Sequence, residues 1–361
     1  MKYFLILLIV VTSAIASCKK NKNTPTPFVT ESLYFPPNTG SEWATTTAQS
    51  LGWNTTELNN LNAYLLNKNT KAFIILKNGK IVNEQYFGTF TSDSLWYWAS
   101  AGKTLTALLV GIAQKDGLIN INNPTSLYLG TGWTSAPLAK ENLITIKNQL
   151  TMTSGLDDLN GNNDCTLPSC LSYKADAGTR WAYHTGAYTV LDKVIENASG
   201  MSYNTYYQQK LRDRIGMNGG WVKTLNSNNV NFSNARSMAR FGLLMLAKGV
   251  WNGTPILNDT AYINTMINTS QPLNKGYGYL TWLNGKESFM FPGLQAVVAQ
   301  SIVANAPADM YCALGKNDQK IYVVPSKKIV VIRMGNSAGV AQSALSSFDD
   351  ELWGKLKLII L

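Results

Sequence analysis

An apolar run from Trp96 to Ala113, with a serine and a lysine near its start, constrains this chain more than any other stretch. The pattern predicts a helix from about Ser100 to Lys115, ended by Asp116-Gly117. Residues three apart share a helix face, so Ser100 and Lys103 point into the same space. A serine becomes a good nucleophile when a base takes its proton, and burial lowers the pKa of a lysine so that its amine can do so. The alternative is an ordinary helix start in which Ser100 is only the N-cap.

The N-terminus has the pattern of an export signal. A short positive start and an apolar core too short to span a bilayer predict a signal peptide over residues 1–17. The ending Ile15-Ala-Ser-Cys18 resembles a bacterial lipobox, which implies cleavage before Cys18 and acylation of that cysteine. We therefore expect a lipid-anchored protein of the bacterial cell envelope, facing the periplasm or the cell surface, with a tether over residues 18–40. The alternative is an ordinary signal peptide followed by an incidental cysteine.

Composition argues against several kinds of site. The chain has one histidine, His184, and no Cys or His pair with metal-ligand spacing, so we expect no metal and no cofactor. The net charge is +10, but no arginine-rich run is present, so we expect a solvated surface and no nucleic-acid partner. Cys165 and Cys170 lie in a polar loop, where an oxidising envelope favours a disulfide over free thiols.

Strand patterns at both ends of the chain surround a mainly helical middle. Asn78-Gly79 separates two apolar runs within residues 71–87 and predicts a hairpin. Further strands are expected over residues 276–283, 319–325 and 328–334, and further helices over residues 186–198, 234–248 and 340–361. This order predicts an α+β fold in which an antiparallel sheet from both chain ends is flanked by helices and carries an inserted helical lobe. We expect the domain to cover residues 41–361, with an α/β lobe over about 41–125 and 271–361 and a helical lobe over about 126–270.

Three ordered motifs resemble the serine beta-lactamase-related hydrolases. They are Ser100-x-x-Lys103, the run from Ile144 to Leu156, and Gly178-Thr-Arg-Trp-x-Tyr183. The likeness is greatest to the class C, carboxylesterase and 6-aminohexanoate-oligomer hydrolase branch, and it covers the chain from about Gly52 to its end. It implies the beta-lactamase/transpeptidase-like fold, which is the arrangement of strands and helices predicted above.

The resemblance also implies roles for individual residues. Ser100 is the nucleophile, Lys103 is its activating base, and Tyr183 relays the proton to the leaving group. The family motif is Tyr-x-Asn, but Thr185 takes the place of the asparagine. This difference argues against the recognition of lactams. His184 and Trp181 are candidates for substrate contact, together with Thr185. The alternatives are a locally hydrogen-bonded loop histidine and a plain core tryptophan.

The family's Lys-Thr-Gly strand motif is replaced here by Ala313-Leu314-Gly315. Gly315, a further candidate for substrate contact, still permits close approach of two backbones. The resemblance implies that the backbone N–H groups of Ser100 and Lys316 form the oxyanion hole. The lysine that would bind a lactam carboxylate is missing, and the Lys316 side chain should point away from the site if the strand is regular.

A second serine motif, Gly335-Asn-Ser-Ala-Gly339, matches the nucleophile elbow of a different hydrolase fold. That fold needs a histidine after the serine, and none follows. The sequence therefore predicts a serine hydrolase that cleaves a small ester or amide through an acyl-enzyme and contacts the membrane through its lipid anchor. One alternative is a D-amino-acid peptidase or penicillin-binding-type enzyme acting on cell-wall fragments. Another is a non-catalytic envelope binding protein, against which the retained Ser100, Lys103 and Tyr183 argue.

Overall fold

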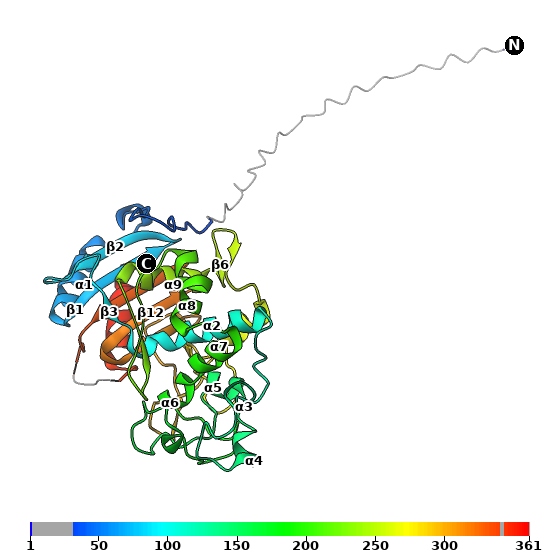
Figure 1. Ribbon diagram of the computed structural model, residues 1–361. Helices are drawn as coiled ribbons and strands as arrows, with labels where there is room; N and C mark the ends of the chain where they lie inside the picture. Colours follow the sequence, from blue (N-terminus) through cyan, green and yellow to red (C-terminus); the bar gives the residue numbers. More distant parts are fainter. Residues whose placement is uncertain (2–31, 340–342, 361) are drawn as a thin grey trace. The chain divides into compact units, whose positions relative to one another are not determined.

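A six-stranded antiparallel sheet forms the centre of the fold, and both ends of the chain supply its strands (Figure 1). The strand order is β2-β1-β13-β12-β11-β8. The strands are β1 (Thr70–Lys77), β2 (Lys80–Tyr86), β8 (Trp282–Leu283), β11 (Tyr311–Gly315), β12 (Gln319–Val324) and β13 (Ile329–Gly335). The predicted sheet built from the two chain ends is therefore confirmed.

The structure, a computed structural model, describes residues 1, 32–339 and 343–360 of the chain. Its contacts define two units, Met1–Ser32 and Leu33–Leu361, and the sheet and its helices belong to the second. Residues 2–17 of the predicted signal peptide, Cys18 and the tether as far as residue 31 lie outside the described residues. Residues 33–40, which the sequence assigns to the tether, belong to the folded unit. In that segment the Tyr34 N–H donates to the Asn78 carbonyl at 2.9 Å.

The hairpin at Asn78-Gly79 joins β1 to β2 as predicted. Both turn residues have positive φ, 51° and 82°, which is the type I′ geometry that matches the twist of the flanking strands. On its other side β1 pairs with β13, so Ile74 lies opposite Ile332. The first hairpin of the domain thus lies beside its last strand.

Helices cover both faces of the sheet. On one face α9 (Ala235–Leu246) packs against β12 and β13, and a methyl group at Gly242 would lie 2.5 Å from Val330 Cγ1. On the other face α11 (Ser347–Ile359) packs through Trp353, whose ring meets that of Tyr322 at 5.7 Å. α1 (Thr55–Asn67) lies beside α11. The sequence assigns α9 to the helical lobe, but α9 lies on the sheet, because its apolar pattern does not specify which partner buries it.

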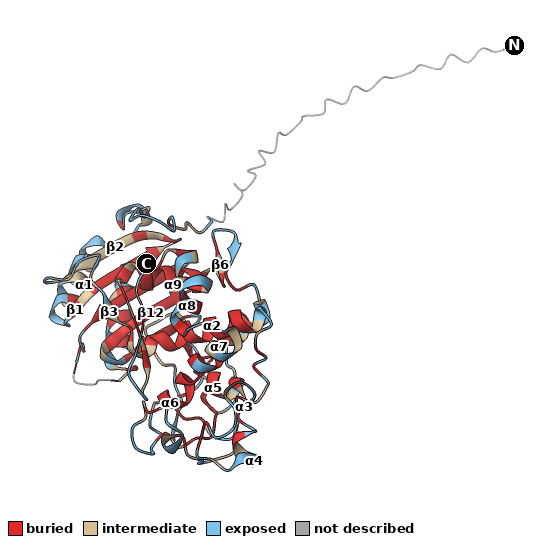
Figure 2. Cartoon of the chain, in the orientation of Figure 1, coloured by how far each residue is buried: buried red, intermediate tan, exposed pale blue. Residues whose placement is uncertain are grey.

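The helix α2 (Gly102–Lys115) follows a 3₁₀ turn, η2 (Ala99–Ala101), and is buried from Gly102 to Ala113 (Figure 2). It contacts β11 as well as α7 and α10. The other helices are α3 (Ser126–Leu129), α4 (Leu138–Glu141), α5 (Ile146–Leu150), α6 (Thr185–Thr189), α7 (Leu191–Ser199), α8 (Tyr203–Tyr207) and α10 (Thr260–Met266). Short turns of helix are η1 (Gln49–Leu51), η3 (Pro168–Cys170), η4 (Gln208–Arg212), η5 (Asp213–Ile215) and η6 (Lys316–Asp318). Small sheets are formed by β3 (Trp96–Tyr97), β4 (Gly220–Lys223) and β5 (Asn229–Ser233), by β6 (Val250–Trp251) and β7 (Thr254–Pro255), and by β9 (Phe289–Met290) and β10 (Val297–Val298).

The segment 276–283 differs from its prediction, because only Trp282 and Leu283 are in a strand. The Gly278 N–H donates to the Thr281 carbonyl at 2.8 Å, and Leu280 has a φ of 47°. The chain therefore turns back on itself before it enters the sheet. The final helix also starts later than predicted, at Ser347, where Ser346 and Asp349 form a capping box.

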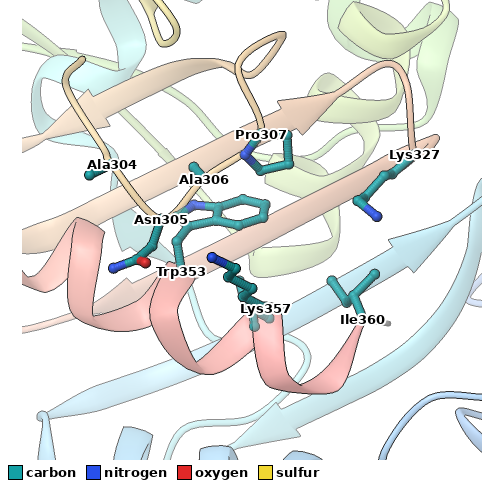
Figure 3. Close-up of a pocket in the computed structure, with 9 residues that line it drawn as sticks. Ala304, Asn305, Ala306, Pro307, Lys327, Trp353, Lys357 and Ile360 are labelled. Carbon is teal, nitrogen blue, oxygen red and sulfur yellow. The ribbon is translucent and has the colours of Figure 1, made fainter. Parts of the chain in front are cut away.

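A hollow of about 370 Å³ lies between α11 and the segment 304–307 (Figure 3). Trp353, Lys357 and Ile360 line one side, and Lys327 lies at one end. None of the predicted site residues lines it. Across the described residues, no helix combines the length and the apolar character that crossing a bilayer needs.

Candidate active site

Ser100 lies in the turn η2, between β3 and the first residue of α2. The residue before it, Ala99, has a φ of 47°, a left-handed conformation that residues other than glycine seldom adopt. The buried side chain of Trp98 secures this turn, because its indole N–H donates to Ser233 Oγ at 2.8 Å. The Trp98 N–H also donates to the Asn231 carbonyl at 2.8 Å. The strained turn presents the half-buried Ser100 at the head of a buried helix.

Lys103 is 2% exposed, and its amine lies directly beside Ser100. Lys103 Nζ is 2.9 Å from Ser100 Oγ and 3.3 Å from Thr185 Oγ1. It also lies over the rings of Tyr183 and Tyr188, at 4.8 and 4.4 Å from their centroids. Burial lowers the pKa of Lys103 to about 7. The amine is therefore partly neutral near pH 7 and has the geometry to accept the serine proton.

Tyr183 approaches Ser100 from the segment before α6. Burial raises the pKa of Tyr183 far above its usual value, although hydrogen bonds with the side chains of Ser100 and Trp282 act in the opposite direction. The ring stacks on Trp282 at a centroid distance of 5.7 Å. Tyr183 is therefore a neutral phenol, whose hydroxyl can both donate and accept a hydrogen bond.

Thr185, His184 and Trp181 have different surroundings. Thr185 contacts the amine of Lys103, a contact that the sequence does not suggest. His184 is 2% exposed, and burial lowers its pKa to about 4, so the imidazole is neutral at pH 7. Trp181 is buried in an aromatic cluster with Tyr183, Tyr277 and Trp282. Its side chain packs behind Tyr183.

The end of β11 meets the turn that carries Ser100. A Cβ atom on Gly315 would lie 2.4 Å from the Trp98 carbonyl oxygen and 3.0 Å from the Ala101 nitrogen, so only glycine fits there. Lys316 follows directly as the first residue of η6, and it is exposed. The sequence predicts that the Lys316 side chain points away from the site if the strand continues regularly. The strand ends at Gly315, so this alternation of side chains does not extend to Lys316.

The loop before Tyr183 is tied to the site. Cys165 and Cys170 form a disulfide with a Cα–Cα distance of 6.0 Å. Asn163 donates to the Tyr183 carbonyl at 3.3 Å and accepts from the Thr185 N–H at 2.9 Å. Sequence reasoning missed Asn163 and Trp282, since one is an ordinary loop residue and the other an ordinary strand residue until the fold brings them to Tyr183.

Among the described residues, no group of three or more His, Cys, Asp and Glu side chains is placed to hold a metal ion.

A family model described as Beta-lactamase matches residues 69–350, most of the chain. The chain belongs to the beta-lactamase family. As a member of this family it is a hydrolase, in agreement with the serine hydrolase predicted from Ser100 and Lys103.

The chain is similar to several known proteins and solved structures at low identity. An uncharacterized protein of Alkalihalophilus pseudofirmus is 22% identical over 301 residues, 73% of this chain and 83% of that protein. Teichoic acid D-alanine hydrolase of Staphylococcus aureus is 30% identical over 151 residues, 39% of this chain but only 38% of the hydrolase. A putative 6-aminohexanoate-dimer hydrolase from Bacillus anthracis matches with a TM-score of 0.66 and 17% identity, over 90% of this chain and 89% of that chain. A putative beta-lactamase from Bacteroides dorei matches with a TM-score of 0.65 and 18% identity, over 85% of this chain and 99% of that chain. The predicted beta-lactamase/transpeptidase-like fold is thus confirmed.

Proposed function

We propose that this protein hydrolyses a small ester or amide through an acyl-enzyme on Ser100. The observation that carries the proposal is the 2.9 Å contact between Lys103 Nζ and Ser100 Oγ inside a buried site. Burial lowers the pKa of the Lys103 amine to about 7, so near that pH it is an available base. No imidazole is needed for this step, and the single histidine is buried and neutral at pH 7.

The proposed reaction has two halves. In the first, Lys103 takes the Ser100 proton while Oγ bonds to the substrate carbonyl carbon, and the backbone N–H groups of Ser100 and Lys316 stabilise the oxyanion. The Tyr183 phenol then gives its proton to the leaving alcohol or amine and regains one from protonated Lys103. In the second half a water molecule attacks the acyl carbon and loses a proton to Lys103. The bond between the acyl carbon and Ser100 Oγ then breaks, the acid leaves, and protonated Lys103 returns its proton to Oγ.

The missing lysine of the strand motif supports a substrate without the carboxylate of a beta-lactam. Ala313 is buried and presents a methyl group where the family motif places an ammonium group. The names of two relatives are compatible with this substrate class, since one is a teichoic acid D-alanine hydrolase and the other a putative 6-aminohexanoate-dimer hydrolase. We therefore place simple esters first and D-aminoacyl amides second.

A fluorescent fluorophosphonate tests the nucleophile, with Ser100→Ala as the matched control. We expect the natural protein to be labelled and Ser100→Ala to remain unlabelled. Labelling should be accompanied by hydrolysis of p-nitrophenyl acetate and by little hydrolysis of a chromogenic cephalosporin. A natural protein that is folded but neither labelled nor active on esters and D-alanyl p-nitroanilide would instead be the non-catalytic binding protein.

We also propose that the mature chain begins at an acylated Cys18 and is held at the cell envelope. The support is the order of residues in the sequence, an apolar core, then small residues, then Cys18. Membrane fractionation of the natural protein and of Cys18→Ala tests this proposal. Release of only the variant into the soluble fraction supports the anchor, and equal release of both contradicts it.

A further inference from the structure

The turn that carries the proposed oxyanion donor Lys316 has an unusual backbone. Asn317 and Asp318, the next two residues of η6, have φ values of 59° and 58°. Two consecutive non-glycine residues in the left-handed region are strained, and such a turn persists only when its surroundings hold it. The contacts that hold it therefore also determine where the Lys316 N–H points.

Arg333 supplies two of these contacts from within the sheet. Its side chain is fully buried in β13, and one guanidinium nitrogen, Nη1, donates to the carbonyl oxygens of Asn317 and Asp318 at 3.2 and 2.9 Å. The other nitrogens donate to the Lys68 and Asn336 carbonyl oxygens at 2.7 and 2.8 Å and to Thr70 Oγ1 at 3.2 Å. The planar guanidinium thus fastens the turn to the first strand and to the end of its own strand.

Further contacts hold the turn from other directions. Gln319 Nε2 donates to the Asn317 carbonyl at 2.8 Å and to the Gly335 carbonyl at 2.6 Å. The Asp318 carboxylate accepts from Ser346 Oγ at 2.6 Å and from the Ala338 N–H at 2.9 Å. On the side of the catalytic serine, Asn317 Nδ2 donates to the Tyr97 hydroxyl at 2.8 Å, two residues before the turn of Ser100.

We infer that Arg333 is a positioning residue that holds the Lys316 N–H in the orientation of an oxyanion donor. This inference rests on the proposed function, because it assigns a purpose to the same oxyanion hole. A donor fixed before the substrate arrives needs no reorganisation when negative charge develops on the carbonyl oxygen. Among the described residues Arg333 makes no hydrogen bond to Ser100 or Lys103, and its link to the site is the pair of hydrogen bonds to the carbonyl oxygens of the turn.

The test compares Arg333→Met with Arg240→Met. Arg240 is also a buried arginine that donates to backbone carbonyl oxygens, those of Ile215 and Pro37, at 2.8 and 2.7 Å. It makes no hydrogen bond to η6 among the described residues, so its variant controls for the general effect of losing a buried guanidinium. Both variants are assayed on p-nitrophenyl acetate at a temperature at which circular dichroism shows them folded.

We expect Arg333→Met to lower kcat about 10- to 100-fold with KM nearly unchanged, somewhat less than the loss of an oxyanion donor itself. The midpoint of its pH–rate profile should match that of the natural protein, because Lys103 is untouched. Arg240→Met should keep kcat within about twofold of the natural value. Equal kcat values for the two variants would overturn the inference.

A second variant keeps the test decisive if Arg333→Met does not fold. Gln319→Leu removes the other side-chain donor to the Asn317 carbonyl, and it should lower kcat with little change in KM. An unchanged kcat in folded Gln319→Leu would count against a turn held for catalysis. Failure of the proposed function looks different, since then the natural protein itself would be neither labelled nor active.

Discussion

Lys103 and Lys320 are both buried lysines near the end of β11, yet they have opposite surroundings. The Lys103 amine contacts two hydroxyl groups, Ser100 and Thr185, and two aromatic rings. The Lys320 amine lies 2.9 Å from a carboxylate oxygen of Asp349 and 3.3 Å from one of Asp318, and it donates to the Ala344 carbonyl at 2.8 Å. The groups in contact with the Lys103 amine are neutral, whereas two carboxylates enclose the Lys320 amine.

The difference shows how the same residue type becomes a base in one place and a structural ion in another. Burial disfavours the charged amine and lowers the pKa of Lys103 to about 7, although the charge of Asp164 acts in the opposite direction. Around Lys320, the ammonium charge and the Ser346 hydrogen bond lower the pKa of Asp318 even though burial raises it. The first lysine is suited to exchange a proton, and the second binds α11 to the sheet through Asp349.

The matched substitution Lys103→Met should give the largest loss of activity. It removes the base and keeps the apolar stem, so turnover of p-nitrophenyl acetate should fall by about 10⁴-fold or more, as far as in Ser100→Ala, because the two groups act as one unit. The free energy of unfolding should rise by about 1–2 kcal/mol, since a buried amine that contacts no carboxylate among the described residues is removed. The sign of this change in stability follows from the pKa of Lys103, which is about 7 in the folded protein and 10.5 in the free side chain. The buried amine therefore opposes folding below about pH 10.5, and it does so most strongly below pH 7. A Lys103→Met protein that stays active and is less stable than the natural protein would contradict the contrast between Lys103 as a base and Lys320 as a structural ion.

Tyr183→Phe should have the next largest effect on turnover. The change keeps the ring that stacks on Trp282 and removes only the hydroxyl, so the fold should survive. Loss of a proton-transfer group lowers the rate by about 10²–10⁴-fold. Steady-state kinetics with esters of differing leaving-group pKa provide the measurement, and the loss should be greatest for the poorest leaving group. A uniform loss across that series would argue against a proton relay.

Lys320→Met should mainly affect stability. It leaves the carboxylates of Asp318 and Asp349 buried without their cation, which costs about 3–5 kcal/mol. Denaturant unfolding should show this loss at pH 7. The loss should shrink as the pH falls through the lowered pKa of Asp318, because a protonated Asp318 carboxyl no longer needs the cation. A Lys320→Met protein as stable as Lys103→Met would mean that the two surroundings do not differ as described.

Local sequence patterns predict the parts of this molecule that depend on neighbouring residues. The turn at Asn78-Gly79 and the helix that starts near Ser100 follow from residues a few positions apart, and both are present. The segment 276–283, predicted as one strand, is mostly a turn, because the Gly278 N–H bonds to the Thr281 carbonyl. An apolar pattern in the sequence does not reveal this hydrogen bond.

The surroundings of the two lysines depend on contacts between distant segments. Thr185 reaches Lys103 from 82 positions away, and Asp349 reaches Lys320 from 29. The family resemblance supplies Tyr183 and the place of Lys316, but it offers no sign of Trp282 behind the phenol or of Arg333 behind the turn. Such residues have no local signature, since their roles exist only once the sheet has formed.

The pH dependence of kcat/KM tests the central claim most directly, that Lys103 is the neutral base of this site. We expect activity on p-nitrophenyl acetate to rise with pH through a single ionisation near 7, the pKa to which burial lowers Lys103. The same midpoint should persist in His184→Gln, because burial lowers the pKa of His184 to about 4. A midpoint near 10.5, the ordinary pKa of a lysine, or a midpoint near 7 that disappears in His184→Gln would contradict the account.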